Sequence, residues 1–202
     1  MPSFYTPSVP GEALRQGELL SFVVETNIKP GFQYRDSPAV EFDSIEHELA
    51  IVLSQDCDLS TDHLMRTLIK NAEEGQDTSK FEAKKLSRAL LCEVDLASTV
   101  KTNDSGSWDR ISKNNDPRFH FLQKCAQDED AQREGLDSLI VNFKQPFTVT
   151  IDDLLMRILQ GETKRRFCMQ SPYFEHVSDR FAHYLARVGL PNDHDPKRKC
   201  EQ

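Results

Sequence analysis

The chain has 202 residues and a mass of 23.1 kDa, enough for one domain or for one domain with a small appendage. Its 25 basic and 33 acidic side chains leave a formal net charge of −8, which argues against broad binding to a nucleic-acid backbone. No run of 18 apolar residues exists, so we expect neither a transmembrane helix nor a membrane partner.

The N-terminal third predicts an extended segment followed by two strands. Residues 1–16 carry three prolines and little periodicity, which predicts an extended N-terminal arm. Residues 17–24 are rich in β-branched and aromatic side chains and predict the first strand. A loop punctuated by proline and glycine follows over residues 27–38. The continuous apolar run at residues 48–54 predicts a strand that is buried on both faces.

The middle of the chain predicts inserted helices. Asp62 can cap a helix whose apolar face holds Leu64, Leu68 and Ile69. Residues 80–90 have the charge and the Ala/Leu content of a second helix. The run at residues 89–94 then predicts another strand, and a short helix is expected around residues 108–112.

The C-terminal part predicts three more strands and two helices. Strands are expected at residues 118–122, 138–143 and 147–150, and Thr150 can cap a short helix. Ser171 and Pro172 suit the start of a final helix. Its apolar stripe is spaced by 3, 4, 4 and 3 residues and consists of Phe174, Val177, Phe181, Leu185 and Val188.

Close-spaced short strands with inserted helices favour an α+β domain built on a small barrel or curled sheet. We expect an arm at residues 1–16, a single domain at 17–191 and a charged tail at 192–202. The start of the chain lacks the basic and apolar regions of a signal peptide, and the five cysteines form no local pairs. These features predict a cytoplasmic protein with mostly reduced thiols.

The most unusual local sequence follows the buried strand and consists of Ser54, Gln55, Asp56, Cys57 and Asp58. In one interpretation Ser54 and Asp56 shape a turn through hydrogen bonds to the backbone, and Cys57 is a small buried hydrophobe. The same residues are also a candidate interaction motif, because the end of a buried strand is a rigid place from which to present polar groups.

Two reactive interpretations of this motif stay open. Cys57 could be a nucleophile activated by His120 or His47, although nearby carboxylates disfavour a thiolate. Cys57 and Asp58 could also bind a metal with a histidine, but no CxxC or HxxxH spacing supports this. We therefore expect no metal and no cofactor.

Arg118 and His120 form a second candidate site. They alternate with Phe119 and Phe121, so both polar side chains are expected on one strand face. An arginine beside a histidine can bind phosphate or take part in acid–base chemistry. The alternative is a solvated strand face paired with acidic residues.

A basic concentration suggests a candidate anion-binding patch. Its members are Lys164, Arg165, Arg166, Arg180 and Arg187. Arg180 and Arg187 are seven residues apart and are expected on one helix face. The alternative is that they form salt bridges with Glu175 and Asp179 on an exposed helix.

Segments 17–20 and 50–54 resemble the opening strands of the MazF/PemK-like toxins, in which a strand beginning G-D leads through a loop to a strand ending V-L-S. A larger part of the chain resembles a MazF-like side branch found near prokaryotic defence genes. The shared features are an S-Q-D-C-D-L turn at 54–59, an R-x-H strand at 118–120, a V-x-F-K strand at 141–144 and a terminal helix motif at 171–191.

The resemblance implies a small SH3-like (MazF/PemK-like) β-barrel with inserted helices and a C-terminal helix. The toxins dimerise and cut RNA without a metal, using an arginine before the V-L-S strand together with a serine or threonine. On that basis Ser54, Arg118 and His120 are the candidate catalytic residues here. His47 and Glu48 stand where the arginine is expected, and a carboxylate there repels a phosphate.

MazF-like domains also serve as non-catalytic parts of type III CRISPR accessory complexes that hold a sigma factor. We therefore expect a non-catalytic interaction module in a prokaryotic defence or regulatory complex, with another protein subunit as its partner. The alternative is a metal-independent endoribonuclease that acts on RNA. Homodimerisation is compatible with either hypothesis.

Overall fold

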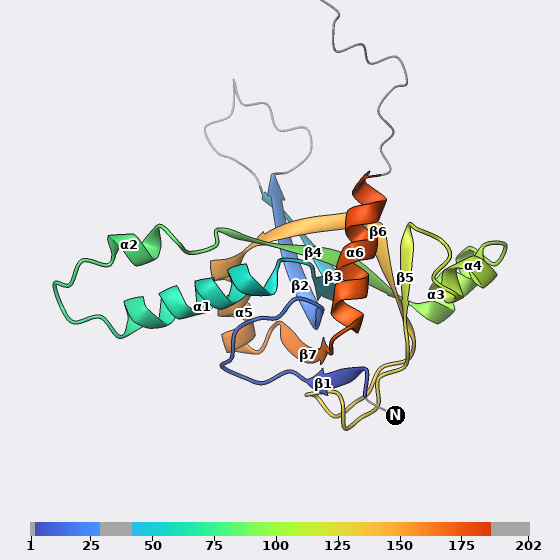
Figure 1. The fold of residues 1–202 in the computed structure, drawn as a ribbon, viewed down its shortest axis with the longest axis horizontal. Helices are drawn as coiled ribbons and strands as arrows, with labels where there is room; N and C mark the ends of the chain where they lie inside the picture. Colours follow the sequence, from blue (N-terminus) through green and yellow to red (C-terminus); the bar gives the residue numbers. More distant parts are fainter. Residues whose placement is uncertain (1–2, 29–41, 187–202) are drawn as a thin grey trace, which may run out of the picture.

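The computed structural model describes residues 3–28 and 42–186, which form one antiparallel sheet of seven strands surrounded by helices (Figure 1). The strands are β1 (Tyr5–Pro7), β2 (Glu18–Ile28), β3 (Phe42–Val52), β4 (Arg88–Leu96), β5 (Phe119–Leu122), β6 (Leu139–Thr150) and β7 (Lys164–Met169). The helices of the described part are α1 (Asp56–Lys70), α2 (Ser79–Glu82), α3 (Ala97–Asn103), α4 (Trp108–Ser112), α5 (Ile151–Gln160) and α6 (Tyr173–Ala186).

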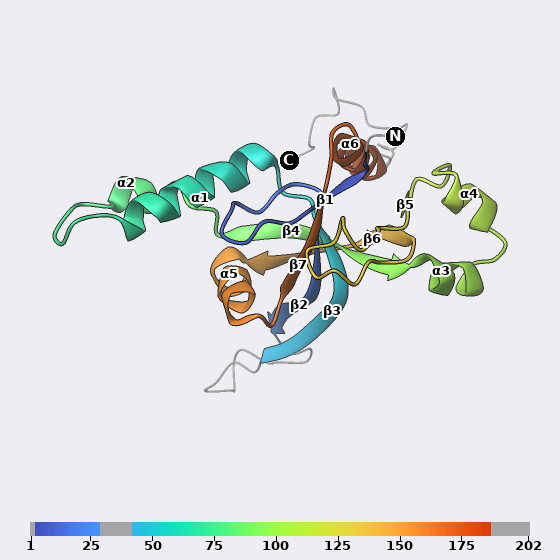
Figure 2. The same ribbon diagram turned by 90° about the horizontal axis from the view of Figure 1, so that it is seen from below.

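Both faces of the central part of the sheet are buried, because apolar side chains point alternately to each side, whereas the first half of β3 is exposed. Leu19 belongs to a core that α6 covers through Val177 and Phe181. Leu20, its neighbour in β2, belongs to a second core beneath α1 and α5. Both leucines are fully buried. The helices pack on the sheet for this reason, with α1 and α2 extending to one side of the sheet and α3 and α4 to the other (Figure 2).

The sheet is curled, but it does not close. The strand order is β1-β7-β2-β3-β4-β6-β5, so β1 and β5 are its edges. The hydroxyl of Tyr5 in β1 donates a hydrogen bond to the carbonyl of Gln123, just after β5, at 2.8 Å. The two edges therefore approach each other without forming a ladder. The predicted α+β class is confirmed, whereas the expectation of a closed barrel is wrong.

The outer edge of β5 is blocked by side chains, and this explains why the sheet stays open. Asn114 Oδ1 accepts the Phe121 N–H at 2.7 Å, and Asn114 Nδ2 donates to the Phe121 carbonyl at 3.4 Å. Arg180 of α6 donates to the Phe119 carbonyl at 2.8 Å. The backbone groups that a closing strand would need are already satisfied, which also protects this edge from pairing with other chains.

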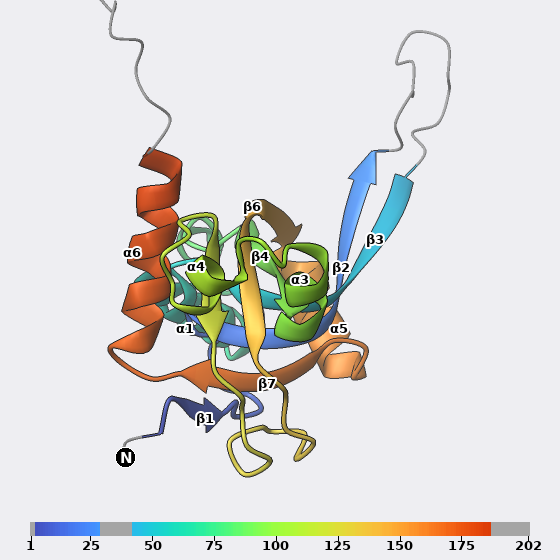
Figure 3. The ribbon, with the colours of Figure 1, turned by 90° about the vertical axis from the view of Figure 1, so that its right-hand side faces the viewer.

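Part of the N-terminal segment forms the short strand β1, and the segment is packed into the domain. β1 pairs with β7, and both Tyr5 and Leu14 are buried. β7 itself was not predicted, because Lys164, Arg165 and Arg166 suggested an anion-binding patch. β7 lies between β1 and β2 in the sheet and pairs with both, and Figure 3 shows it running next to β1.

Several predicted boundaries changed. The helix expected to start at Asp62 starts at Asp56, and the second inserted helix is limited to Ser79–Glu82. The strands expected at 138–143 and 147–150 are one strand, β6, in which Pro146 lies where the ladder with β4 shifts register. A proline is tolerated there because a β-bulge does not need the N–H that proline lacks.

The other predicted strands, α4 and the C-terminal helix are confirmed. The loop prediction beyond residue 28, Val188 and the tail lie outside the described residues.

Candidate functional site

The junction between β3 and α1 holds the Ser54–Asp58 motif, and its polar groups bind other parts of this chain. Ser54 Oγ accepts the backbone N–H of Leu90 at 2.9 Å. Asp56 Oδ2 accepts hydrogen bonds from Arg15 Nε and Nη2 at 3.1 and 2.9 Å, and Asp56 Oδ1 accepts the Gln16 N–H at 2.6 Å. Asp56 thus fixes the N-terminal segment to the start of α1. This supports the structural interpretation of the motif for Ser54 and Asp56.

Cys57 is exposed rather than buried, which corrects the structural interpretation for this residue. Its sulfur lies 3.6 Å from Gln55 Oε1 and 3.7 Å from Asp58 Oδ1. His47, one of the proposed bases, is instead buried against the ring of Phe147, with Nε2 3.3 Å from a Glu25 oxygen. In residues 3–28 and 42–186, no group of three His, Cys, Asp or Glu side chains is placed to hold a metal ion.

Arg118 is held by a carboxylate. Its Nε and Nη2 donate to the two oxygens of Asp116 at 2.9 and 2.7 Å. Asp116 is almost fully buried, and the Arg118 guanidinium holds the pKa of that carboxyl down at about 2. The pair is therefore ionised at neutral pH. A phosphate would have to compete with a permanent bidentate partner for this guanidinium.

His120 is buried on the inner side of β5, next to α6, and is 7% exposed. Burial, together with the charges of Arg180 and His176, lowers its pKa to about 3. The ring is neutral at pH 7, and its Nδ1 has no hydrogen-bond partner among the described residues. His120 lines a pocket of about 360 Å³ at the opening between β1 and β5. A histidine with this pKa is a poor general base.

The three candidate catalytic residues do not form one site. β4 and β6 lie between β3 and β5, so Ser54 is three strand spacings, or about 14 Å along the sheet, from the strand that carries His120. No hydrogen bond joins Ser54 to Arg118 or His120 in the described part of the chain. Ser54 is therefore separated by the sheet from Arg118 and His120, which lie two residues apart at β5.

The predicted anion patch is dispersed, and its guanidinium groups are engaged internally. Arg165 pairs with the buried carboxylate of Glu18, and Arg166 pairs with the buried Asp130. Arg180 donates to three backbone carbonyls rather than to Glu175 or Asp179. Lys164 is half-buried in β7, and Arg187 lies outside the described residues. Together, these contacts engage Arg165, Arg166 and Arg180 within the fold.

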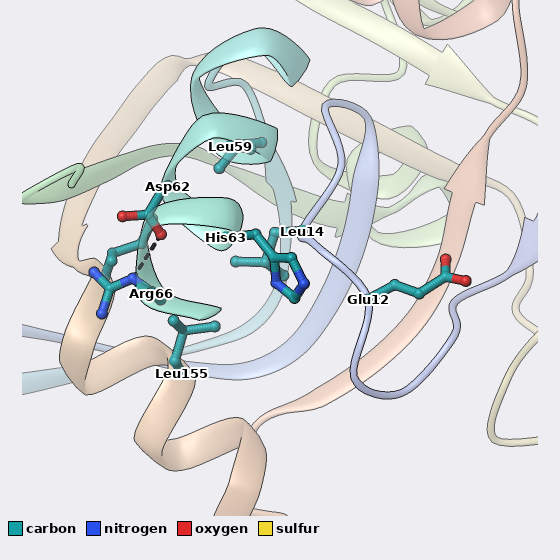
Figure 4. A pocket seen from close by; sticks show the side chains of 8 residues that line it. Glu12, Leu14, Leu59, Asp62, His63, Arg66 and Leu155 are labelled. Atoms are coloured by element: carbon teal, nitrogen blue, oxygen red, sulfur yellow. Dashed lines mark hydrogen bonds and ion pairs between the residues drawn. The ribbon is translucent and has the colours of Figure 1, made fainter. Parts of the chain in front are cut away.

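A polar pocket between α1, α5 and the N-terminal segment is too small for a substrate. Its volume is about 30 Å³, which is room for roughly one water. Asp62 accepts a hydrogen bond from Arg66 Nε at 2.7 Å, and the His63 ring lies beside Leu14 (Figure 4). Asp62 also accepts the Leu86 N–H at 2.9 Å. The buried Asp62 thus ties α1 to the segment before β4, a role the sequence did not reveal.

A second surface feature was missed by sequence reasoning. The end of α5, the segment after β1 and the loop before β6 enclose a groove of about 630 Å³. Leu159, which lines it, is 84% exposed. The sequence held no signal for this feature, because Leu159 follows Leu155 by four residues and is expected on the same helix face.

The chain matches no protein-family model and no curated protein. None of the helices in the described ranges is both long and apolar enough to cross a bilayer.

Proposed function

We propose that this protein is a non-catalytic interaction module with a divergent, opened MazF/PemK-like sheet, acting as a subunit of a prokaryotic defence or regulatory complex. The observation that supports this function best is the bidentate pairing of Arg118 with the buried Asp116. The strongest candidate for binding a phosphate already has a permanent internal partner.

The remaining candidate groups support the same proposal. Ser54 uses its hydroxyl to accept a backbone hydrogen bond, and His120 is buried with a pKa of about 3. Glu48, which stands where the toxins carry a cation, is exposed. A carboxylate at this place repels a scissile phosphate rather than stabilising its transition state.

The partner that we propose is a protein, in the cytoplasm, and the net charge of −8 favours a partner that does not rely on phosphate contacts. A complex in which a MazF-like domain helps to hold a sigma factor is the setting that the resemblance of the chain suggests. The proposal does not require the protein to be a monomer.

Incubation of the purified protein with a mixed RNA substrate, with and without EDTA, tests this function. We expect intact RNA in both samples. Cleavage that persists in EDTA and is abolished by Arg118→Ala would overturn the proposal in favour of a metal-independent endoribonuclease. Arg110→Ala is a matched control, because Arg110 also faces Asp116 but only at 3.9 Å.

A second measurement addresses the complex directly. The tagged protein, expressed at its native level, is expected to elute from size exclusion well above the position of the 23.1 kDa chain. Elution at that position, with no associated protein, would contradict a role as a subunit.

A further inference from the structure

The groove at the end of α5 combines apolar walls with a positive rim. Pro7 and Pro10 form one side, and Ile158 and Leu159 at the end of α5 form another. Leu159 is 84% exposed, so most of this large apolar side chain contacts solvent. Exposed apolar surface of this kind in a concave site is typical of a place where a partner side chain binds.

The charge of the groove is opposite to that of the protein. Among the residues that line it, Arg133, Lys164 and Arg165 are cationic and none is acidic, although the net charge of the chain is −8. Arg165 is neutralised by Glu18. In residues 3–28 and 42–186, no carboxylate forms a salt bridge with Arg133 or Lys164. These two cations are therefore available to a ligand at the rim.

The fold also holds the side chain of Lys164 in place. Its Nζ lies 5.8 Å from the ring centroid of Phe22, which holds the ammonium group near the surface of β2. Arg133 belongs to the loop that Asp130 fixes through three backbone N–H groups. The Lys164 side chain and the loop that carries Arg133 are thus both held in place by contacts with other parts of the fold.

We propose that this groove binds a segment of a partner protein that carries a large apolar side chain flanked by carboxylates. This inference rests on the proposed function and names the chemistry of the partner. The apolar side chain fills the space beside Leu159, and the carboxylates pair with Arg133 and Lys164. Electrostatic complementarity of this kind selects acidic segments and rejects basic ones.

Selection of a random peptide library against the immobilised protein tests the inference. The enriched peptides are expected to carry a Leu, Ile, Phe or Trp with carboxylates close to it in the sequence. Leu159→Asp is expected to weaken their binding about tenfold or more, as the loss of a central anchor does. Leu64→Asp in α1 is the matched control, since Leu64 is also exposed, at 52%, but does not line the groove.

A charge reversal sharpens the test. In Arg133→Glu/Lys164→Glu, the same library is expected to enrich basic peptides in place of acidic ones. Enrichment of basic peptides by the unaltered protein, equal binding by Leu159→Asp, or no enrichment at all would overturn the inference. A dimer in light scattering that is lost in Leu159→Asp would also overturn it, because a second copy would then occupy the groove.

The two proposals fail separately. RNA cleavage by the purified protein overturns the non-catalytic function whatever the groove binds. Absence of acidic peptides from the selection, with the RNA intact, overturns only the assignment of the groove.

Discussion

The buried carboxylate of Asp130 accepts two hydrogen bonds from the guanidinium of Arg166, from Nε to Oδ1 at 3.0 Å and from Nη2 to Oδ2 at 2.7 Å. Asp130 also accepts the backbone N–H groups of Gln132, Glu134 and Gly135. One side chain therefore ties the loop before β6 to β7. These contacts, led in strength by the Arg166 pairing, keep the pKa of Asp130 below its usual value despite burial.

Asp130→Asn is expected to destabilise the fold by about 3 kcal/mol, because it leaves the buried Arg166 without its main counter-charge. Urea denaturation of the purified variant measures this. Glu134→Gln is the control, since Glu134 also contacts Arg166 but is exposed, and its loss should cost about 0.5 kcal/mol. Equal destabilisation by both variants would contradict a dominant role for Asp130.

Asp56→Ala is expected to release the N-terminal segment from α1. The change removes the acceptor for Arg15 and for the Gln16 N–H, and should cost about 1–2 kcal/mol. Limited digestion with trypsin, followed by mass spectrometry, should show faster cleavage after Arg15. Asp58→Ala, on the same helical turn, should leave the cleavage rate unchanged. A similar rate in all three proteins would show that Asp56 does not hold the segment.

His120 predicts a specific dependence of stability on pH. Its pKa is about 3 in the fold and 6.5 in a model peptide, so below pH 6.5 the unfolded chain takes up a proton that the folded chain does not. The contribution of the neutral His120 ring to the free energy of unfolding is therefore complete above pH 6.5. It falls as the pH drops from 6.5 towards 3, by about 1.4 kcal/mol per pH unit. Relative to His120→Gln, the unaltered protein should lose stability over this range.

Urea denaturation of both proteins between pH 4.5 and 7.5 gives the comparison. The difference in unfolding free energy should be constant above pH 6.5 and should change steadily below it. A constant difference across the whole range would mean that His120 takes up its proton at the same pH in the folded and the unfolded chain.

Cys57 is expected to be alkylated before the other described cysteines. Burial raises the pKa of Cys92 and Cys168 to about 12, and that of Cys125 shifts to a similar value, so these thiols are protonated as well as shielded. Iodoacetamide at pH 8, followed by peptide mapping, should modify Cys57 in the native protein and the other three only after denaturation. Equally fast modification of Cys92 would contradict this order.

The fold was predictable where a residue's role depends on its neighbours in the sequence. The apolar run at 48–54 correctly indicated a doubly buried strand, and the stripe from Phe174 correctly indicated the C-terminal helix. β7 was not predictable in this way. Three successive basic residues suggest an exposed segment. Only pairing with Glu18 and Asp130, which are distant in sequence, allows Arg165 to be half-buried and Arg166 to be buried.

The candidate site was predictable in its residues but not in their relationships. The pattern correctly placed Ser54 at the end of a strand and His120 on a strand face. Asp62 shows the limit: it suits a helix cap by its type, yet it is buried in the second turn of α1, where it binds Arg66 and the Leu86 N–H. Contacts such as the one between Asp62 and the Leu86 N–H depend on how distant segments assemble, which local sequence propensity does not encode.

Composition and periodicity alone thus determined an acidic α+β chain with short strands and a terminal helix, because these features follow from the burial of alternating or helically spaced apolar side chains. The tertiary structure decided that the sheet stays open and that Arg118 is neutralised by Asp116. It also decided that Leu159 and two cations border one groove. The reason is physical: pairing between charged groups and the blocking of a sheet edge depend on distances between segments, and those distances are set only when the strands assemble.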